Sequence, residues 1–134
     1  MILADTSVWI EFLNGDLGSG ITEETMFQVV TCAPVIQEVF QGLRPMPQSR
    51  LFEERFLALP CLSDPLPLGL FLEAAEIYRQ GRRKGFTIRS SIDCLIAAIA
   101  IHNGVPVWHK DRDFDLIARY TALETLKSPT GEKR

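Results

Sequence analysis

The pattern of apolar and polar positions predicts one helix that is buried on nearly every side. Residues 94–101 form an unbroken apolar run, which at 3.6 residues per turn covers almost the whole circumference of a helix. Ser90, Ser91 and Asp93 stand where this helix is expected to begin. Ser90 followed by Asp93 three residues later fits a capping box, and an acid in the first turn also suits the helix dipole. A capping role therefore explains Asp93 when that residue is considered alone.

Short apolar runs predict strands between the other helices. Residues 1–4, 29–32 and 105–108 are apolar or β-branched, and each run is followed by a polar residue or a proline and then by a helical pattern. Strands that alternate with helices predict an α/β fold with a mostly parallel sheet. Besides the central helix, which is expected to end at Asn103, helices are predicted at residues 8–13, 21–28, 34–43, 48–59, 68–83 and 115–120.

Carboxylates stand at the ends of several predicted elements. Asp5 directly follows the first strand and Asp111 follows the last, so both are expected at the carboxyl edge of the sheet. Asp93 and Asp113 stand at helix N-termini, and Glu38 lies on the first turns of the helix after the strand at 29–32. Because such helix N-termini usually face the same edge, the pattern predicts five carboxylates on one rim of the molecule.

Five neighbouring carboxylates predict a divalent cation, since without one their charges would repel each other. No His or Cys stands at a suitable spacing, and an all-oxygen ligand set favours Mg²⁺ or Mn²⁺ over zinc. Mg²⁺ bridges to phosphate, so the predicted reaction is hydrolysis of a phosphodiester bond, with Glu38 or Asp113 orienting or deprotonating the attacking water. A basic cluster before the central helix would hold the flanking phosphates: Arg82, Arg83, Lys84 and Arg89.

Each acid also has a simpler explanation when it is taken singly. Asp5 can cap the helix that follows it, although Thr6 and Ser7 are equally suited, and Glu38 is expected at the boundary of its helix or in solvent. A rival enzyme class is a phosphatase that forms a phosphoaspartate on Asp5. Such enzymes generally carry a second Asp two residues further on, where this chain has Ser7.

Composition adds limits on class and compartment. The 134 residues are 46% apolar and 23% charged, which is typical of one soluble domain, and the longest apolar run is too short for a membrane span. Acids interrupt the apolar N-terminus, so no secretory signal is expected. The three cysteines are widely spaced and are expected to be reduced thiols in a cytoplasmic protein. A net charge of −3 argues against a surface that binds nucleic acid without specificity.

Four segments resemble, in order, the motifs of PIN-domain proteins. Residues 3–10 (LADTSVWI) resemble the opening motif, and residues 34–39 (PVIQEV) resemble the second acidic motif. Residues 87–97 (TIRSSIDCLIA) and 109–114 (HKDRDF) resemble the third and fourth motifs. The segments follow the family's spacing across nearly the whole chain. With this third motif, the chain resembles in particular the VapC toxins of bacterial and archaeal toxin–antitoxin pairs.

The resemblance implies a fold, an activity and partners. It implies a PIN-like three-layer α/β/α sandwich, here expected at residues 1–126 with a polar, frayed tail at 127–134. It also implies a Mg²⁺- or Mn²⁺-dependent endoribonuclease that a cognate VapB-type antitoxin inhibits by covering the acidic rim. Homodimers, and binding to operator DNA only through the antitoxin, are further implications. A PIN fold that binds RNA or protein without cutting is the alternative, but such proteins usually lack some of the acids, and none is missing here.

The motifs also assign roles to residues. Asp5, Asp93 and Asp111 are implied as metal ligands, and Glu38 as support for the water or for a second metal. The fourth motif varies, so either Asp111 or Asp113 is the working acid there. Many relatives have Thr or Ser at the position of His109. Outside the motifs, Trp9 and Trp108 are expected in the core, whereas four apolar side chains on helical faces suit the core, a dimer interface or antitoxin binding: Phe52, Phe56, Leu70 and Phe71.

Overall fold

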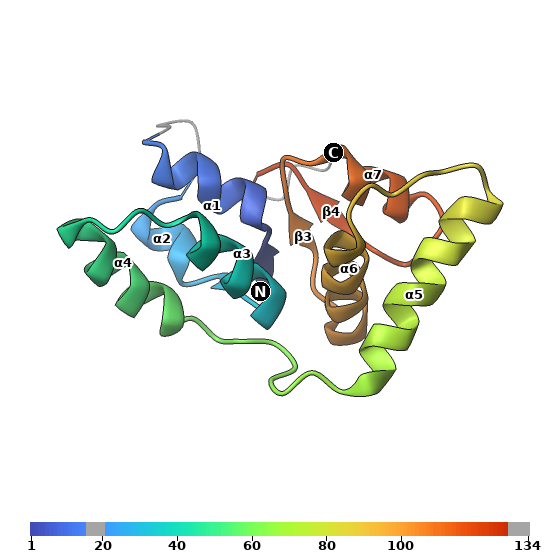
Figure 1. Ribbon diagram of the computed structural model, residues 1–134, viewed down its shortest axis with the longest axis horizontal. Helices are drawn as coiled ribbons and strands as arrows, with labels where there is room; N and C mark the ends of the chain where they lie inside the picture. The colour runs from blue at the N-terminus through green and yellow to red at the C-terminus, as the bar shows by residue number, and fades with distance from the viewer. Residues whose placement is uncertain (16–20, 129–134) are drawn as a thin grey trace.

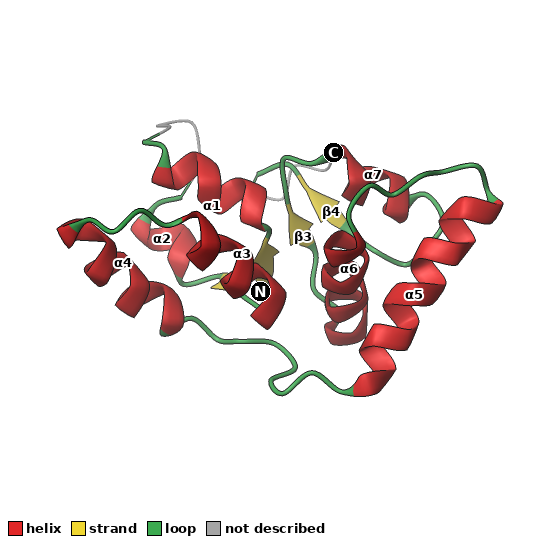
Figure 2. Cartoon of the chain, in the orientation of Figure 1, coloured by secondary structure: helices red, strands yellow, loops and turns green. Residues whose placement is uncertain are grey.

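A parallel sheet of four short strands forms the centre of the computed structural model, which describes residues 1–15 and 21–128. The strands β1 (Ile2–Ala4), β2 (Val29–Val30), β3 (Val107–Trp108) and β4 (Thr125–Leu126) lie in the order β2-β1-β3-β4. Leu3 of β1 pairs with Val30 on one side and with Val107 on the other. The predicted α/β class with a parallel sheet is therefore confirmed. Figure 2 shows how short the strands are beside the helices.

The helices lie close to their predicted positions, with shifted ends. Helix α1 begins at Thr6 and α7 at Arg112, each earlier than predicted, because Asp5 and Asp111 act as their N-cap residues. Strand β4 was not predicted, since two residues carry no alternating pattern. The helices are α1 (Thr6–Leu13), α2 (Glu23–Met26), α3 (Ala33–Gly42), α4 (Pro47–Leu57), α5 (Leu68–Arg83), α6 (Ser91–Asn103) and α7 (Arg112–Ala118).

The strand order produces three layers. Parallel strands need crossover connections, and these are nearly always right-handed. The chain moves from β1 to β2 in one direction along the sheet, and from β2 past β1 to β3 and β4 in the other. Crossovers of one hand that run in opposite directions place helices on opposite faces of the sheet, as the α/β/α prediction requires. Figure 1 shows α1 to α4 gathered on one side of the molecule and α5 alongside α6 on the other.

Helix α6 is the buried central helix that the apolar run predicted. Every residue from Asp93 to Ala100 is buried, and Gly104 ends the helix in a left-handed conformation with φ of 65°. The predicted capping box, however, is wrong. Ser90 is the N-cap residue, but its side chain makes no capping hydrogen bond, and the backbone N–H of Asp93 bonds to the Ser90 carbonyl instead. Capping therefore does not explain the carboxylate of Asp93.

The sheet topology brings distant parts of the chain to one edge. β1 and β3 are neighbours in the sheet. The connection that leaves β1 leads to β2 on one side, and the connection that leaves β3 leads to β4 on the other, so the two separate at the carboxyl ends of β1 and β3. Asp5 follows β1 and Asp111 lies three residues after β3, which places both at this divergence. In open parallel sheets this is the position where ligands bind.

Three further predictions concern the core, the cysteines and the tail. Trp9 and Trp108 are both buried, as predicted, and so are Phe56 and Leu70, whereas Phe71 is exposed. All three cysteines are free thiols. Residues 129–134 of the predicted tail lie outside the described residues. Within the described ranges, no helix has both the length and the apolar character needed to cross a membrane.

Candidate active site

An open cleft of about 240 Å³ lies at the carboxyl edge of β1 and β3. Four of the five predicted acids line it: Asp5 from the start of α1, Glu38 from α3, Asp93 from α6 and Asp111 from the start of α7. Thr6, Ser7, Ile10 and Ser90 complete the lining. The structure thus brings together acids that are up to 106 positions apart in the sequence, as their placement at element ends predicted.

The fifth acid, Asp113, is not part of the cleft lining and belongs to a tight cluster with two of the other acids. Oxygens of Asp93, Asp111 and Asp113 all lie within 4.8 Å of one another. Asp93 and Asp113 are buried, with 5% and 2% exposure, and Asp111 is half-buried. Asp93 and Asp111 are therefore common to the cleft and to the cluster, while Asp5 and Glu38 belong to the cleft and Asp113 to the cluster.

Backbone N–H groups and hydroxyls hold one oxygen of most of these carboxylates. Asp5 Oδ2 accepts from the backbone N–H and the hydroxyl of Ser7, at 3.1 and 2.8 Å. Asp111 Oδ1 accepts from the N–H of Asp113 at 3.0 Å. Two further contacts have the same form: Asp113 Oδ2 accepts from the Arg89 N–H at 3.1 Å, and Glu38 Oε1 accepts from the Thr6 hydroxyl at 2.8 Å.

Other carboxylate oxygens in the site remain available for a cation. Among the described residues, Asp5 Oδ1, Asp93 Oδ2 and Asp113 Oδ1 are buried and have no hydrogen-bond partner. A buried acceptor without a partner costs about 1–3 kcal/mol. Arg89 Nε lies 3.8 Å from Asp113 Oδ1, so the oxygens that need an explanation are those of Asp5 and Asp93. Carboxylate oxygens held on one side and free on the other are suitable ligands for a hard divalent cation. The residues present therefore fit a metal site, and capping and cation binding use different oxygens of Asp5.

The pKa values of the buried acids also favour a bound cation. Burial, together with the negative charges of Asp5, Asp111, Asp113 and Glu38, raises the pKa of Asp93 to about 8. Burial also raises the pKa of Asp5 to about 6, although hydrogen bonds from Ser7 oppose this. Both acids are thus costly to ionise in the absence of a positive charge between them. Such carboxyls in a cleft are typical of functional sites.

Two contacts that the sequence did not predict join the acidic segments. The Ser7 hydroxyl accepts from the backbone N–H of Lys110 at 3.0 Å, which links the start of α1 to the end of β3. The imidazole Nδ1 of His109 accepts from the N–H of Asp111 at 3.1 Å. No sequence signal reports the first contact, because its partners are 103 positions apart. The second contact joins residues only two positions apart, but His is uncommon as the acceptor in such a turn.

The predicted basic cluster is only partly connected to the acids. Arg89 is the member that contacts them: its Nε lies 3.8 Å from Asp113 Oδ1, and its side chain is exposed. Arg82, Arg83 and Lys84 are exposed at the C-terminal end of α5. Arg83 pairs there with Glu76 at 2.8 Å, and its hydrogen bond holds the pKa of that carboxyl below its ordinary value.

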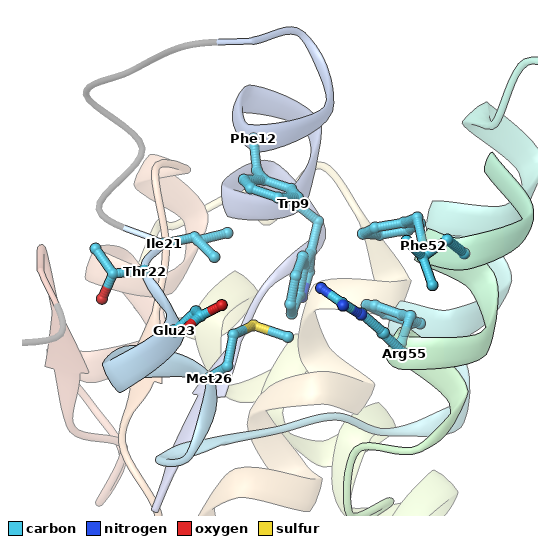
Figure 3. A pocket seen from close by; sticks show the side chains of 10 residues that line it. Trp9, Phe12, Ile21, Thr22, Glu23, Met26, Phe52 and Arg55 are labelled. Carbon is cyan, nitrogen blue, oxygen red and sulfur yellow. The ribbon is translucent and has the colours of Figure 1, made fainter. Parts of the chain in front are cut away.

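A second hollow, an apolar groove of about 340 Å³, lies between α1, α2 and α4. The Trp9 indole stands at its centre, with Phe12 and Phe52 beside it and Arg55 reaching toward it from α4 (Figure 3). The Trp9 Nε1–H is buried and has no hydrogen-bond partner among the described residues. Helix α1 is a wall of both hollows, since Ile10 lines the acidic cleft.

Comparison with known proteins identifies the class. The PIN domain model matches residues 2–120, which is most of the chain. The chain therefore belongs to the PIN-domain family, whose fold and acidic site agree with the geometry described above.

Within this family, the chain is a homologue of the VapC ribonucleases. It is 38% identical over 130 residues to VapC ribonuclease Mb1587 of Mycobacterium bovis. The identity to ribonuclease VapC11 of Mycobacterium tuberculosis is also 38%, and in both comparisons the match covers 92% of this chain and 96% of the relative. The acidic cluster is consistent with the active site of a metal-dependent PIN nuclease.

Solved structures share the fold. A structure of FitAB bound to an IR36 DNA fragment superposes with a TM-score of 0.64 at 21% identity, covering 100% of this chain and 99% of that one. VapC20 of Mycobacterium tuberculosis, a toxin that cleaves the sarcin–ricin loop, superposes with a TM-score of 0.54 at 18% identity, covering 90% and 95%. These superpositions show that the chain shares the fold of these proteins over most of its length.

Proposed function

We propose that the protein is the toxin of a toxin–antitoxin pair, a VapC-type endoribonuclease that hydrolyses RNA phosphodiester bonds with Mg²⁺. Mn²⁺ is expected to substitute. The observation that carries the proposal is that Asp5 and Asp93, which line an open cleft, each have a buried carboxylate oxygen without a hydrogen-bond partner among the described residues. Such oxygens match the preference of both ions for hard oxygen ligands. The VapC homologues support the choice of RNA as the substrate.

The acids of the site have different proposed roles. We assign the ion to Asp5, Asp93 and Asp111, and Asp113 stands close enough to Asp93 and Asp111 to take part. When bound, the ion would polarise the scissile phosphate and make a nearby water more acidic. Glu38 lines the cleft, and its Oε1 is held by Thr6, so its other oxygen is placed to accept a proton from the attacking water.

The test of this proposal is cleavage of RNA by the purified chain. The protein, freed of any partner, is incubated with total cellular RNA in Mg²⁺, in Mn²⁺ and in EDTA. Discrete fragments that need the metal are expected, and their ends would name the target. Intact RNA in every condition, from a folded protein that binds the metal, would contradict the proposal and favour a PIN fold that binds without cutting.

Arg89 is the basic residue best placed to contact the substrate, because its exposed side chain lies beside Asp113 at the edge of the site. Arg89→Ala is expected to raise KM for an RNA substrate by about 3- to 10-fold with little change in kcat, since a phosphate contact is lost. Its backbone hydrogen bond to Asp113 remains in the variant. Steady-state kinetics check this prediction, with Arg50→Ala on α4 as the control. Equal KM values in the two variants would exclude Arg89 from substrate binding.

The proposed partner is a cognate VapB-type antitoxin, and the apolar groove is its proposed docking surface. Helix α1 separates the groove from the acidic cleft, so one antitoxin segment lying across α1 would cover both. Apolar side chains would fill the groove, and an acidic group would meet Arg55 at its wall. FitAB on DNA is consistent with a complex that binds operator DNA through the antitoxin. Homodimers and a cytoplasmic location complete the proposal.

Leu51 allows a test of this docking surface, because it lines the groove and its side chain is 54% exposed. Leu51→Glu is expected to weaken antitoxin binding by about tenfold or more, since the charge must be desolvated, and to leave RNA cleavage unchanged. Leu72→Glu on α5 is the matched control, because Leu72 is exposed and lies outside the groove. Titration calorimetry with the antitoxin measures both. Unchanged affinity in Leu51→Glu would place the antitoxin elsewhere.

A further inference from the structure

His109 is buried at the exact point where the sheet meets the acidic site. It is 0% exposed, and its backbone N–H continues the β3–β4 pairing by donating to the Leu126 carbonyl at 3.3 Å. The ring packs against Phe114, with ring centres 5.1 Å apart. The residue thus joins the core of the sheet to the turn that carries Asp111 and Asp113.

The imidazole makes contacts on both of its nitrogens. The N–H of Asp111 donates to Nδ1 at 3.1 Å, so Nδ1 carries no proton and the neutral ring has its proton on Nε2. Nε2 lies 3.2 Å from Asp115 Oδ1 without a hydrogen bond between them, and the nearby negative charge favours a proton on Nε2. Asp115 therefore supports the tautomer that leaves Nδ1 free to accept from Asp111.

We infer that His109 is a positioning residue for the Asp111 carboxylate, an inference that rests on the proposed metal-dependent activity. A side-chain acceptor at one residue that binds the N–H two residues later is the geometry of an Asx- or ST-turn. His109 provides this acceptor from an imidazole nitrogen. It sets the direction in which the turn after β3 presents Asp111 to the cleft.

The neighbouring contacts explain why one hydrogen bond has this effect. Lys110 and Asp111 are successive residues, and a side chain holds the N–H of each: Ser7 that of Lys110 and His109 that of Asp111. Asp111 Oδ1 in turn accepts from the N–H of Asp113. Loss of the His109 acceptor would leave the Asp111 N–H without its partner and free Asp111 to rotate, together with its link to Asp113.

The test compares side chains with and without an acceptor. His109→Asn keeps an oxygen close to the position of Nδ1, and His109→Leu fills the space without one. Mn²⁺ affinity, measured by titration calorimetry, is expected to fall by about 10- to 100-fold in the Leu variant and to stay within about threefold of wild type in the Asn variant. His102→Asn, at the exposed second histidine, is the control. Equal affinities in the Leu and Asn variants, whether both retained or both reduced, would overturn the inference.

A spectroscopic measurement decides the inference independently of metal and RNA. Long-range ¹H–¹⁵N spectra of the metal-free wild type are expected to show His109 with its proton on Nε2, assigned through the His109→Asn variant. If the His109→Leu variant does not fold, Asp115→Ala provides a second test, because Asp115 is only partly buried. This variant is expected to shift the tautomer balance of His109 toward a proton on Nδ1. A proton on Nδ1 in the wild type would exclude the acceptor role. This result stands even if the protein proves to have no nuclease activity.

Discussion

Asp93→Asn is expected to lower RNA cleavage by about a thousandfold or more while the protein remains folded. Asn has nearly the shape of Asp, and no capping hydrogen bond from Ser90 depends on this residue. The substitution removes the carboxyl group that the cleft shares with the cluster of Asp111 and Asp113, and with it a ligand that ionises when it binds a cation. Charge that is preorganised toward a reacting group is commonly worth 10²–10³ in rate, and loss of a metal ligand adds to this about as much again.

Cleavage is measured on one defined RNA in Mg²⁺ and in Mn²⁺, at a protein concentration high enough to detect a residual rate. Glu124→Gln, at an exposed acid outside the cleft, is the matched control and is expected to cleave like the wild type. Near-normal cleavage by Asp93→Asn would mean that the buried carboxylate has only a structural role.

The metal-free protein is expected to become less stable as the pH rises from about 5 to about 8. The pKa of Asp93 is about 8 in the fold and near 3.8 in the unfolded chain, so the folded state binds this proton more tightly. Above the pKa that Asp93 has in the unfolded chain, ionisation stabilises the unfolded state and lowers the free energy of unfolding. This loss of stability is complete above the pKa that Asp93 has in the folded protein. Asp5, with a folded pKa of about 6, contributes with the same sign. A tenfold difference in proton affinity is worth about 1.4 kcal/mol, so a loss of several kcal/mol is expected over this pH range.

Urea unfolding in EDTA across this pH range measures the effect. The Asp93→Asn variant is expected to have a flatter pH profile and, at pH 8, a larger free energy of unfolding than the wild type. Mg²⁺ at pH 8 is expected to stabilise the wild type and to stabilise the variant much less, since a ligand that binds only the folded state adds stability. A wild-type stability that is constant or rises toward pH 8 would contradict the electrostatics described for the site.

Much of the fold follows from patterns that act locally. The apolar run at residues 94–101 would cover nearly every side of a helix, which predicts a buried one, and α6 is buried from Asp93 to Ala100. The position of Asp5 and Asp111 just after strands was enough to bring them together, because parallel strands end at a common edge. Strand β4 was missed because its two residues are held by pairing with β3, and neither carries a pattern of its own.

The candidate site was predictable in its acids but not in the contacts that hold them. Five carboxylates were named from element ends, and the structure places four in the cleft and Asp113 in the adjoining cluster. The capping box at Ser90 was wrong because the backbone carbonyl of Ser90, and not its hydroxyl, meets the Asp93 N–H. The Ser7–Lys110 contact depends on the packing of α1 against the end of β3, which no local pattern encodes.

The most direct test of the account is the position of Mn²⁺ in crystals of the protein, located by anomalous scattering. We expect a peak in the acidic cleft, in contact with Asp93 and Asp111, that is lost in crystals of Asp93→Asn. Contact with Asp5 or with Asp113 would then identify the third ligand. A wild-type crystal with Mn²⁺ bound only outside the cleft, under conditions in which the same protein cleaves RNA, would contradict the central claim that these carboxylates hold the catalytic ion.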